Sequence, residues 1–506
     1  MRMAVYLVPL FIIVILFIFA LRAYPVMSGD SIYYAATAIN HKLGHGLINQ
    51  LSPMFLAGDP SGAGKFLVFP PLFPLVLSWL MPAGTPQGAH LALFTLYAAT
   101  ILLAAFAYKK LLIPDWEQAG WHRIVIYAFS LFSLAAITIF YPGRPETLAR
   151  LLMTLALFGL LYPHKNWLWL LLGAVLGLNL ATHPGPAILF APLIGVFFAF
   201  YHPMKKALGL TFLALAVSLV VFFLITQIFG YGFLPTAQGV FHQFSRLNSG
   251  LSPAGYLASG QPPVIIQPFS ITKDFLIKII SNLTVSGSAA FQGLIITFSL
   301  ACSLLFYRRF KNRIAAPLLF YLFGLLTAGL LFLLLVYKQN LSYVFALTPL
   351  WILIIAYYPA FLARSKVLKY VALLAIVLSS LVFFYRLALF PFFIKSGMSL
   401  ERARAAFQQL PLDPNQRIGV DGTIWPISEN YGRMYLYGDY EDVKYPTTTI
   451  IMREGVNGWT ELPAELFYCR AVKDFFIRKK PVIFGIPLAN TTPGYAFGVY
   501  DCSSEQ

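Results

Sequence analysis

The stretch MAVYLVPLFIIVILFIFAL, residues 3–21, decides the fold class of this chain. It contains no charged residue, and it is long enough to cross the hydrocarbon core of a bilayer, which takes about 20 residues in a helix. It exceeds the about 7–15 apolar residues of a cleavable signal peptide, and no clear small-residue cleavage site follows it. We therefore expect a retained signal anchor that forms the first transmembrane helix.

The composition of the whole chain extends this interpretation. Of the 506 residues, 59% are hydrophobic and 11% are charged, whereas about 25% of an ordinary soluble domain is charged. Further apolar runs lie at 89–108, 123–141, 147–162, 167–182, 186–201, 207–229, 289–306, 314–336, 341–361 and 367–389. With the first run at 4–22, they predict a polytopic α-helical membrane protein with about eleven spans.

Basic residues indicate the orientation. The net charge is +17, but Lys, Arg and His gather in short loops at 109–110, 164–165, 205–206, 308–313 and 364–369. With this number of spans, all five loops fall on the side of the N-terminus. Because cytoplasmic loops carry an excess of Lys and Arg, we expect a cytoplasmic N-terminus. The same clustering argues against nucleic-acid binding, which would need a basic face.

The opposite side then holds the long connections 23–88 and 230–288. The apolar stretch 66–82 lies in the first of them and is interrupted by three prolines. Counting it as a span would invert every later loop and destroy the charge asymmetry. We therefore expect a helix that lies at the outer surface or is partly inserted.

Residues 1–390 thus form the transmembrane domain, and residues 391–506 are expected to form a small outward-facing soluble α/β domain. Its strand-like runs are RIGVDG (417–422), TTTIIMRE (447–454), PVIFGIPL (481–488) and YAFGVYDC (495–502), and helices are expected over 399–410 and 464–480. Cys469 and Cys502 would pair if this tail faces an oxidising compartment, or stay two unpaired thiols.

Two acidic segments are candidates for chemistry. Asp30, in YPVMSGDSIYYAATAI (24–39), follows the first span and is either a general base at the membrane surface or a helix N-cap. Glu146 and Arg144, in YPGRPETLAR (141–150), lie between the third and fourth spans. The simpler alternative for Glu146 is a favourable position at the helix dipole, and for Arg144 a side chain that snorkels to the interface.

Three further polar residues fall on the same predicted outer side. His183 ends the fifth span in ATHPGPAILF, Lys338 lies in LVYKQNLSYVFALTPL, and Lys65 lies in GAGKFLVFPPLFPL. A structural histidine at a helix break and snorkelling lysines are the simpler alternatives. Mixed acids and bases on one face suit a reaction that deprotonates a hydroxyl and expels a phosphate.

Several of these segments, in this order, resemble the GT-C glycosyltransferases. GDSIYYAATAI (29–39) is similar to the acidic first-loop motif of the family 39-like branch, which includes aminoarabinose lipid A transferases and protein O-mannosyltransferases. FPPLFPLVLSWL (69–80) resembles its Pro-Pro-Leu juxtamembrane helix, and GRPETLA (143–149) its fourth-span segment. The sequence departs from many relatives at Ser31, where a second acid is common, and at Phe69, where Lys is common.

The resemblance implies a hexosyl- or pentosyltransferase that moves a sugar from a polyprenyl-phosphate donor to a lipid, glycan or protein hydroxyl. Asp30 would be the catalytic base of an inverting displacement. Glu146 would orient the acceptor or bind a divalent cation (Mg or Mn). Arg144, Lys338, Lys65 and His183 would contact the donor phosphate. We expect a bacterial inner membrane, with chemistry on its periplasmic side and no other cofactor.

Two other classes of function stay open. A transporter or lipid flippase would show paired halves and broken helices or charges near the middle of the membrane. A non-catalytic membrane protein would use its outer domain and the loop 230–288 to bind a partner. That second alternative predicts that Asp30 and Glu146 do not face a shared cavity.

Overall fold

A computed structural model describes most of the N-terminal half of the chain and parts of the C-terminal half. It covers residues 2–239 with short gaps, residues 348–357, positions scattered between 370 and 410, and the strand residues between 418 and 501. The predicted spans at 289–306 and 314–336, the loop 230–288 beyond residue 239, and Lys338 lie outside the described residues.

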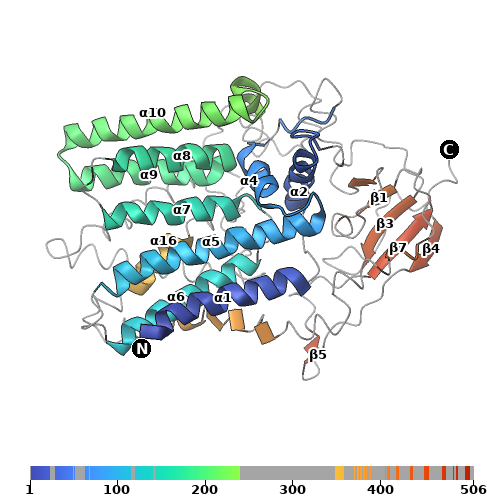
Figure 1. The fold of residues 1–506 in the computed structure, drawn as a ribbon, viewed down its shortest axis with the longest axis horizontal. Helices are drawn as coiled ribbons and strands as arrows, with labels where there is room; N and C mark the ends of the chain where they lie inside the picture. The colour runs from blue at the N-terminus through green and yellow to red at the C-terminus, as the bar shows by residue number, and fades with distance from the viewer. Residues whose placement is uncertain are drawn as a thin grey trace, which may run out of the picture.

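Helices fill the predicted apolar runs up to residue 229. They are α1 (Arg2–Arg22), α5 (Pro86–Leu112), α6 (Trp121–Phe140), α7 (Glu146–Leu161), α8 (Leu168–Thr182), α9 (Pro184–Tyr201) and α10 (Met204–Ile228). Helix α16 (Thr348–Tyr357) lies within the predicted span 341–361. Figure 1 shows these helices side by side in one bundle. The sequence-based helix predictions are confirmed here.

Two of the described helices, α5 and α10, are long and apolar enough to cross a membrane, and α1, α6, α8 and α9 contain shorter apolar segments. Helix α5 is packed inside the bundle, whereas α10 turns large apolar side chains outward. Phe212 is 70% exposed and Leu219 is 58% exposed. Met3, Leu7, Leu10, Val14 and Leu21 form a similar exposed row on α1. Apolar surfaces of this extent need cover from lipid or protein.

Two short helices lie together at one end of the bundle, which we call the α2 end: α2 (Gly29–Lys42) and α4 (Leu72–Leu80) (Figure 1). The nine residues of α4 give a length of about 14 Å, far below the about 30 Å of a bilayer core. Helix α4 begins directly after Pro71. Because Pro71 has no backbone N–H, it cannot donate the hydrogen bond that would continue a helix from the preceding residues. The structure confirms a short helix here and no full span.

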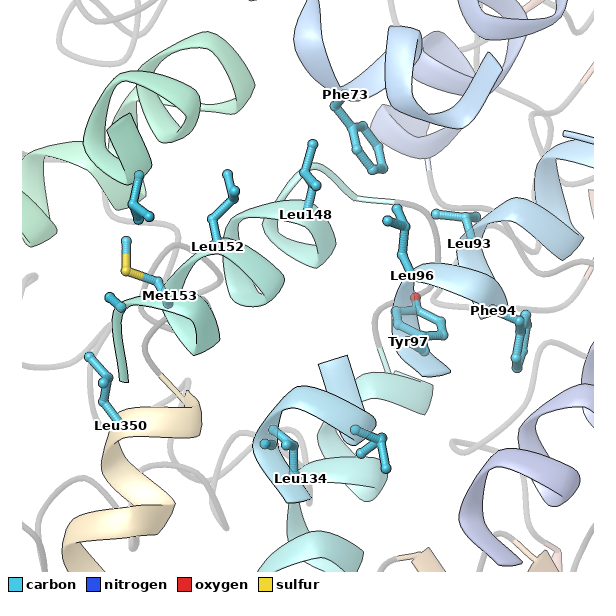
Figure 2. Close-up of a cluster of buried hydrophobic side chains, with 14 of the residues drawn as sticks. Phe73, Leu93, Phe94, Leu96, Tyr97, Leu134, Leu148, Leu152, Met153 and Leu350 are labelled. Atoms are coloured by element: carbon cyan, nitrogen blue, oxygen red, sulfur yellow. The ribbon is translucent and has the colours of Figure 1, made fainter. Parts of the chain in front are cut away.

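Aromatic side chains fix α2 against α4. The ring of Tyr34 lies 5.2 Å from that of Phe73, 5.3 Å from that of Phe69 and 5.5 Å from that of Phe66. Phe73 is fully buried, and Figure 2 shows it near Leu148 of α7. Edge-to-face contacts of this kind add about 0.5–1.5 kcal/mol to burial. They hold α2 against α4 and the segment before it.

Helices α8 and α10 pack closely through small residues. A Cβ atom built on Gly173 would lie 2.5 Å from the carbonyl oxygen of Ala214, and one built on Gly177 would lie 2.6 Å from that of Ser218. The two pairs follow in the same order along both helices, so α8 and α10 run parallel. Such small-xxx-small seams let helix backbones approach in membranes.

The C-terminal tail contains a five-stranded mixed sheet in the order β2-β1-β3-β7-β4 (Figure 1). Its strands are β1 (Ile418–Val420), β2 (Met434–Leu436), β3 (Thr449–Glu454), β4 (Arg470–Asp474) and β7 (Ala496–Asp501), and β5 (Val482–Ile483) pairs with β6 (Ile486–Pro487) separately. Strand β1 is parallel to β2 and β3, whereas β7 is antiparallel to β3 and β4. All four predicted strand-like runs contain strands.

The helix expected over 464–480 is wrong over the residues that form β4. Residues 470–474 pair with β7 at the edge of the sheet. A short segment such as this one does not by itself distinguish a strand from a helix. Pairing with the neighbouring strand β7 determines its conformation. The helix expected over 399–410 falls mostly outside the described residues, as do Cys469 and Cys502. Their disulfide stays a prediction.

Candidate active site

The up-and-down course of the bundle brings the predicted site segments to one end. Helices α5, α7 and α9 begin at the α2 end, and α1 and α8 finish there (Figure 1). Glu146 is the first residue of α7, and His183 joins α8 to α9. The alternation predicted from the loop charges therefore places both residues at the end where α2 begins.

Arg144 and Glu146 form an ion pair in the first turn of α7. The Arg144 Nε atom donates to Glu146 Oε2 at 3.3 Å, and the Glu146 side chain is only 3% exposed. Pro145 sets the turn between them, and the Thr147 N–H donates to the Arg144 carbonyl at 3.0 Å. The carboxylate lies at the positive end of the α7 dipole, which favours its ionised form.

His183 caps α9 with its imidazole. Its Nδ1 atom accepts a hydrogen bond from the Gly185 N–H at 3.1 Å, while its own backbone N–H donates to the Asn179 carbonyl at 2.7 Å. Because Nδ1 is an acceptor, a neutral ring carries its proton on Nε2. The side chain is buried, and its imidazole is close enough to Glu146 to help lower the pKa of that carboxyl. Three predicted site residues therefore share one electrostatic environment.

The charge state of Glu146 follows from this environment. Burial disfavours the carboxylate, but the Arg144 guanidinium and the His183 imidazole outweigh it and hold the pKa of Glu146 below its ordinary value. Glu146 precedes the apolar run of α7 and is ionised at neutral pH. A carboxylate with a lowered pKa and an arginine partner is a weak general base. Glu146 is better suited to orienting groups than to taking a proton.

Asp30 lies in the first turn of α2, and its side chain is outside the described residues. Tyr34, one turn further on, packs on Phe73, which lies near Leu148 in Figure 2. Leu148 follows Glu146 by two residues on α7. The described contacts thus hold α2 against α4 and α5, at the end of the bundle where α7 begins (Figure 1).

Lys65 takes a different position. Its backbone forms an antiparallel bridge with Ile48, and its ammonium group lies 5.8 Å from the centre of the Tyr231 ring, beyond the end of α10. The Tyr231 hydroxyl donates to the Leu47 carbonyl at 2.9 Å. Lys65 therefore faces the α10 side of the bundle, and its contact with a donor phosphate stays a prediction, as does that of Lys338.

No protein-family model and no curated protein matches this chain. Among solved structures, the chain is similar to the oligosaccharyltransferase of Archaeoglobus fulgidus in its apo form, with 14% identity, a TM-score of 0.48, and coverage of 85% of this chain and 64% of that one. The archaeal oligosaccharyltransferase AglB from the same organism, solved with an inhibitory peptide and a dolichol-phosphate, has 13% identity, a TM-score of 0.43, and coverage of 87% and 61%. This chain thus spans less than two thirds of these proteins. The likeness is one of overall helix arrangement and assigns no activity.

A metal site is not visible among the described residues, which contain no group of three or more His, Cys, Asp and Glu side chains that could hold an ion. A crystal structure of the same archaeal protein contains Zn and sulfate. In the present chain, the described carboxylate of Glu146 is already paired with Arg144. A divalent cation stays a prediction.

The sequence analysis missed two buried polar residues. Arg150 lies one turn after Glu146 on α7 and is almost completely buried. Its signal is a charge inside an apolar span, since an arginine inside a membrane helix is costly and usually functional. His90, in the first turns of α5, is 3% exposed, and its two ring nitrogens have no hydrogen-bond partner among the described residues. The sequence around His90 does not indicate that its ring would be buried.

The two roles of His183 can be separated by two substitutions. His183→Ala removes both the cap of α9 and the imidazole, and we expect it to lower the free energy of unfolding by about 1 kcal/mol. His183→Asn keeps a side-chain acceptor for the Gly185 N–H and should retain most of that stability. Thermal unfolding of the purified chain in detergent measures the difference. Equal midpoints for the two variants would contradict a capping role.

Proposed function

We propose that this chain is a membrane-embedded glycosyltransferase that moves a sugar from a polyprenyl-phosphate donor to a hydroxyl acceptor at the α2 end of the bundle. The observation that carries the proposal is the ion pair between the part-buried Arg144 and the buried Glu146, with His183 beside it, at the end of the bundle where α2 carries Asp30 in its first turn. Ionised side chains buried at the end of an apolar bundle are costly, so they favour a site for charged chemistry.

In the proposed reaction, Asp30 takes the proton of the acceptor hydroxyl as its oxygen attacks the anomeric carbon. The bond between that carbon and the phosphate oxygen breaks, and the polyprenyl phosphate leaves with the bonding electron pair. The Arg144 guanidinium and the Nε2–H group of His183 stabilise the departing phosphate. Glu146 holds Arg144 in place and orients the acceptor. A single displacement inverts the anomeric centre.

The exposed apolar rows on α1 and α10 support a membrane location. A donor with a polyprenyl tail would lie along such surfaces with its phosphate at the α2 end. The charge pattern of the loops supports a cytoplasmic N-terminus, which puts the α2 end on the outer side of the membrane. The sheet lies beyond that end of the bundle (Figure 1), in keeping with an outward-facing C-terminal domain.

A lipid transporter is the second candidate, and Arg150 is the observation that favours it. A buried charge within a predicted span is a feature of transport pathways. Arg150 lies, however, only one turn below Glu146, so its position also fits a site at the end of the helix. The transporter proposal predicts movement of an intact lipid without cleavage of its sugar.

The experiment starts from the cell envelope. Mass spectrometry of glycans and lipids from cells with and without the gene identifies the sugar that is lost and its acceptor. The full chain is then reconstituted in vesicles with that sugar, isotopically labelled, on a polyprenyl phosphate. We expect the label to appear in the acceptor, together with an equal amount of free, unlabelled polyprenyl phosphate. Label that crosses the bilayer on an intact lipid, with no transfer, would replace this proposal with the transporter.

A further inference from the structure

Exposed apolar side chains gather at the α2 end. They come from three elements: Leu43 follows α2, Trp79 and Leu80 end α4, and Ile228 and Phe229 end α10. Each is between 39% and 65% exposed. We call these five residues the interfacial patch.

Described contacts hold the three elements of the interfacial patch together. The Trp79 ring lies 5.6 Å from the Phe229 ring in an edge-to-face contact, which joins α4 to α10. His41 Nδ1 and Ser78 Oγ are 2.7 Å apart and join α2 to α4. Leu43 packs so closely on the loop before α5 that a Cβ atom on Gly84 would lie 2.9 Å from it. Contacts between the elements that carry the five residues therefore hold the interfacial patch together as one surface.

The interfacial patch continues the exposed apolar row of α10. The 25 residues of α10 span about 37 Å, which exceeds the about 30 Å core of a bilayer. The last residues of α10 and their neighbour Trp79 would then lie at the level of the lipid headgroups. Trp is enriched at this level because its ring is amphipathic.

A cation lies beside the apolar residues. Lys42 ends α2 and is exposed, and its side chain approaches the same loop as Leu43, with Cγ 3.6 Å from a Cβ built on Gly84. Apolar anchors in the acyl region with a lysine above them match a phospholipid whose headgroup is negative.

We propose that the interfacial patch binds an anionic phospholipid of the outer leaflet, with Lys42 on its headgroup phosphate and Trp79 against its upper acyl chain. The inference rests on the membrane location in the proposed function but not on sugar transfer. It concerns a bulk lipid and not the polyprenyl donor, which belongs at the Arg144–Glu146 pair.

Tryptophan quenching by brominated lipids tests the proposal. The full chain is placed in phosphatidylcholine vesicles that contain either dibromo-phosphatidylglycerol or dibromo-phosphatidylcholine. The fluorescence lost in Trp79→Phe isolates the signal of Trp79 from that of the other tryptophans. We expect the anionic lipid to be preferred about fivefold at Trp79, the size of one lysine–lipid interaction.

Two variants test whether Lys42 itself, and not the overall positive charge of the protein, selects the anionic lipid. Lys42→Gln should abolish the preference and leave quenching by both lipids. Lys206→Gln removes an exposed lysine at the opposite end of α10 and should leave the preference at Trp79 intact. Equal quenching by the two lipids in the unmodified chain would overturn headgroup selection. Absence of quenching by either lipid would overturn lipid contact at Trp79 altogether. Neither outcome would contradict sugar transfer, which is measured in a separate experiment.

Discussion

Replacing Asp30 by Asn is expected to lower sugar transfer by about 100- to 10,000-fold, the usual contribution of a general base. Among the described acids at the α2 end, Glu146 is committed to Arg144, and its lowered pKa makes it a poor proton acceptor. The base must then come from elsewhere, and Asp30 lies in the first turn of α2, at the end of the bundle where α7 begins. The initial rate of label transfer in vesicles measures the effect.

The same substitution separates catalysis from a structural role. Helix α2 begins at Gly29, so Asp30 is its second residue and interacts with the helix dipole, which is worth about 0.3–1 kcal/mol. Asp30→Asn should therefore lower the unfolding midpoint only slightly. Asp474→Asn, at the end of β4, makes the same chemical change in the C-terminal sheet and serves as the matched control. Full transfer by Asp30→Asn would leave Asp30 with a structural role alone and move the base to another residue.

A second large effect is expected at the seam between α8 and α10. In Gly177→Leu, even the Cβ atom would lie 2.6 Å from the Ser218 carbonyl oxygen and 2.7 Å from the Val221 Cβ atom. Both contacts involve atoms that cannot move without moving α10. We expect a loss of at least about 3 kcal/mol, the upper end of the cost of overpacking. The unfolding midpoint in detergent and the yield of folded chain report it.

Gly209 provides the matched control for that prediction. It also lies in a helix of this pair, but a Cβ atom built on it meets nothing within 4 Å. Gly209→Leu should keep or slightly raise stability, because Leu is a better helix former than Gly by about 0.8 kcal/mol. Equal losses in the two variants would contradict the close approach of α8 and α10 as the cause of the loss at Gly177.

The helices were predictable from the sequence because their signal is local. A long apolar run without charges has few structural alternatives, so the predicted run 89–108 falls inside α5, and the run 207–229 matches α10 except for its last residue. The three prolines before and within α4 likewise indicated a short helix. The strands β3 and β7 were predictable from their β-branched and aromatic residues.

Features that depend on partners far away in the sequence were not predictable. Strand β4 owes its conformation to β7, and Lys65 meets Tyr231 only because α10 ends beside α2. The ion pair of Arg144 and Glu146 was predictable because only Pro145 separates them in the sequence, but the addition of His183 needed the fold. Arg150 was overlooked although its charge stands inside an apolar run.

The lengths of the helices have a consequence for the surrounding lipid. Helices α7 and α8 contain 16 and 15 residues, or about 24 and 23 Å, and the ends of α5 and α1 extend past them at the α2 end (Figure 1). A bilayer of about 30 Å must thin or admit water over such short segments. Glu146 and His183 would then lie at the bottom of a hollow in the membrane surface. A lipid phosphate would reach them by sinking with its neighbours, without leaving the leaflet.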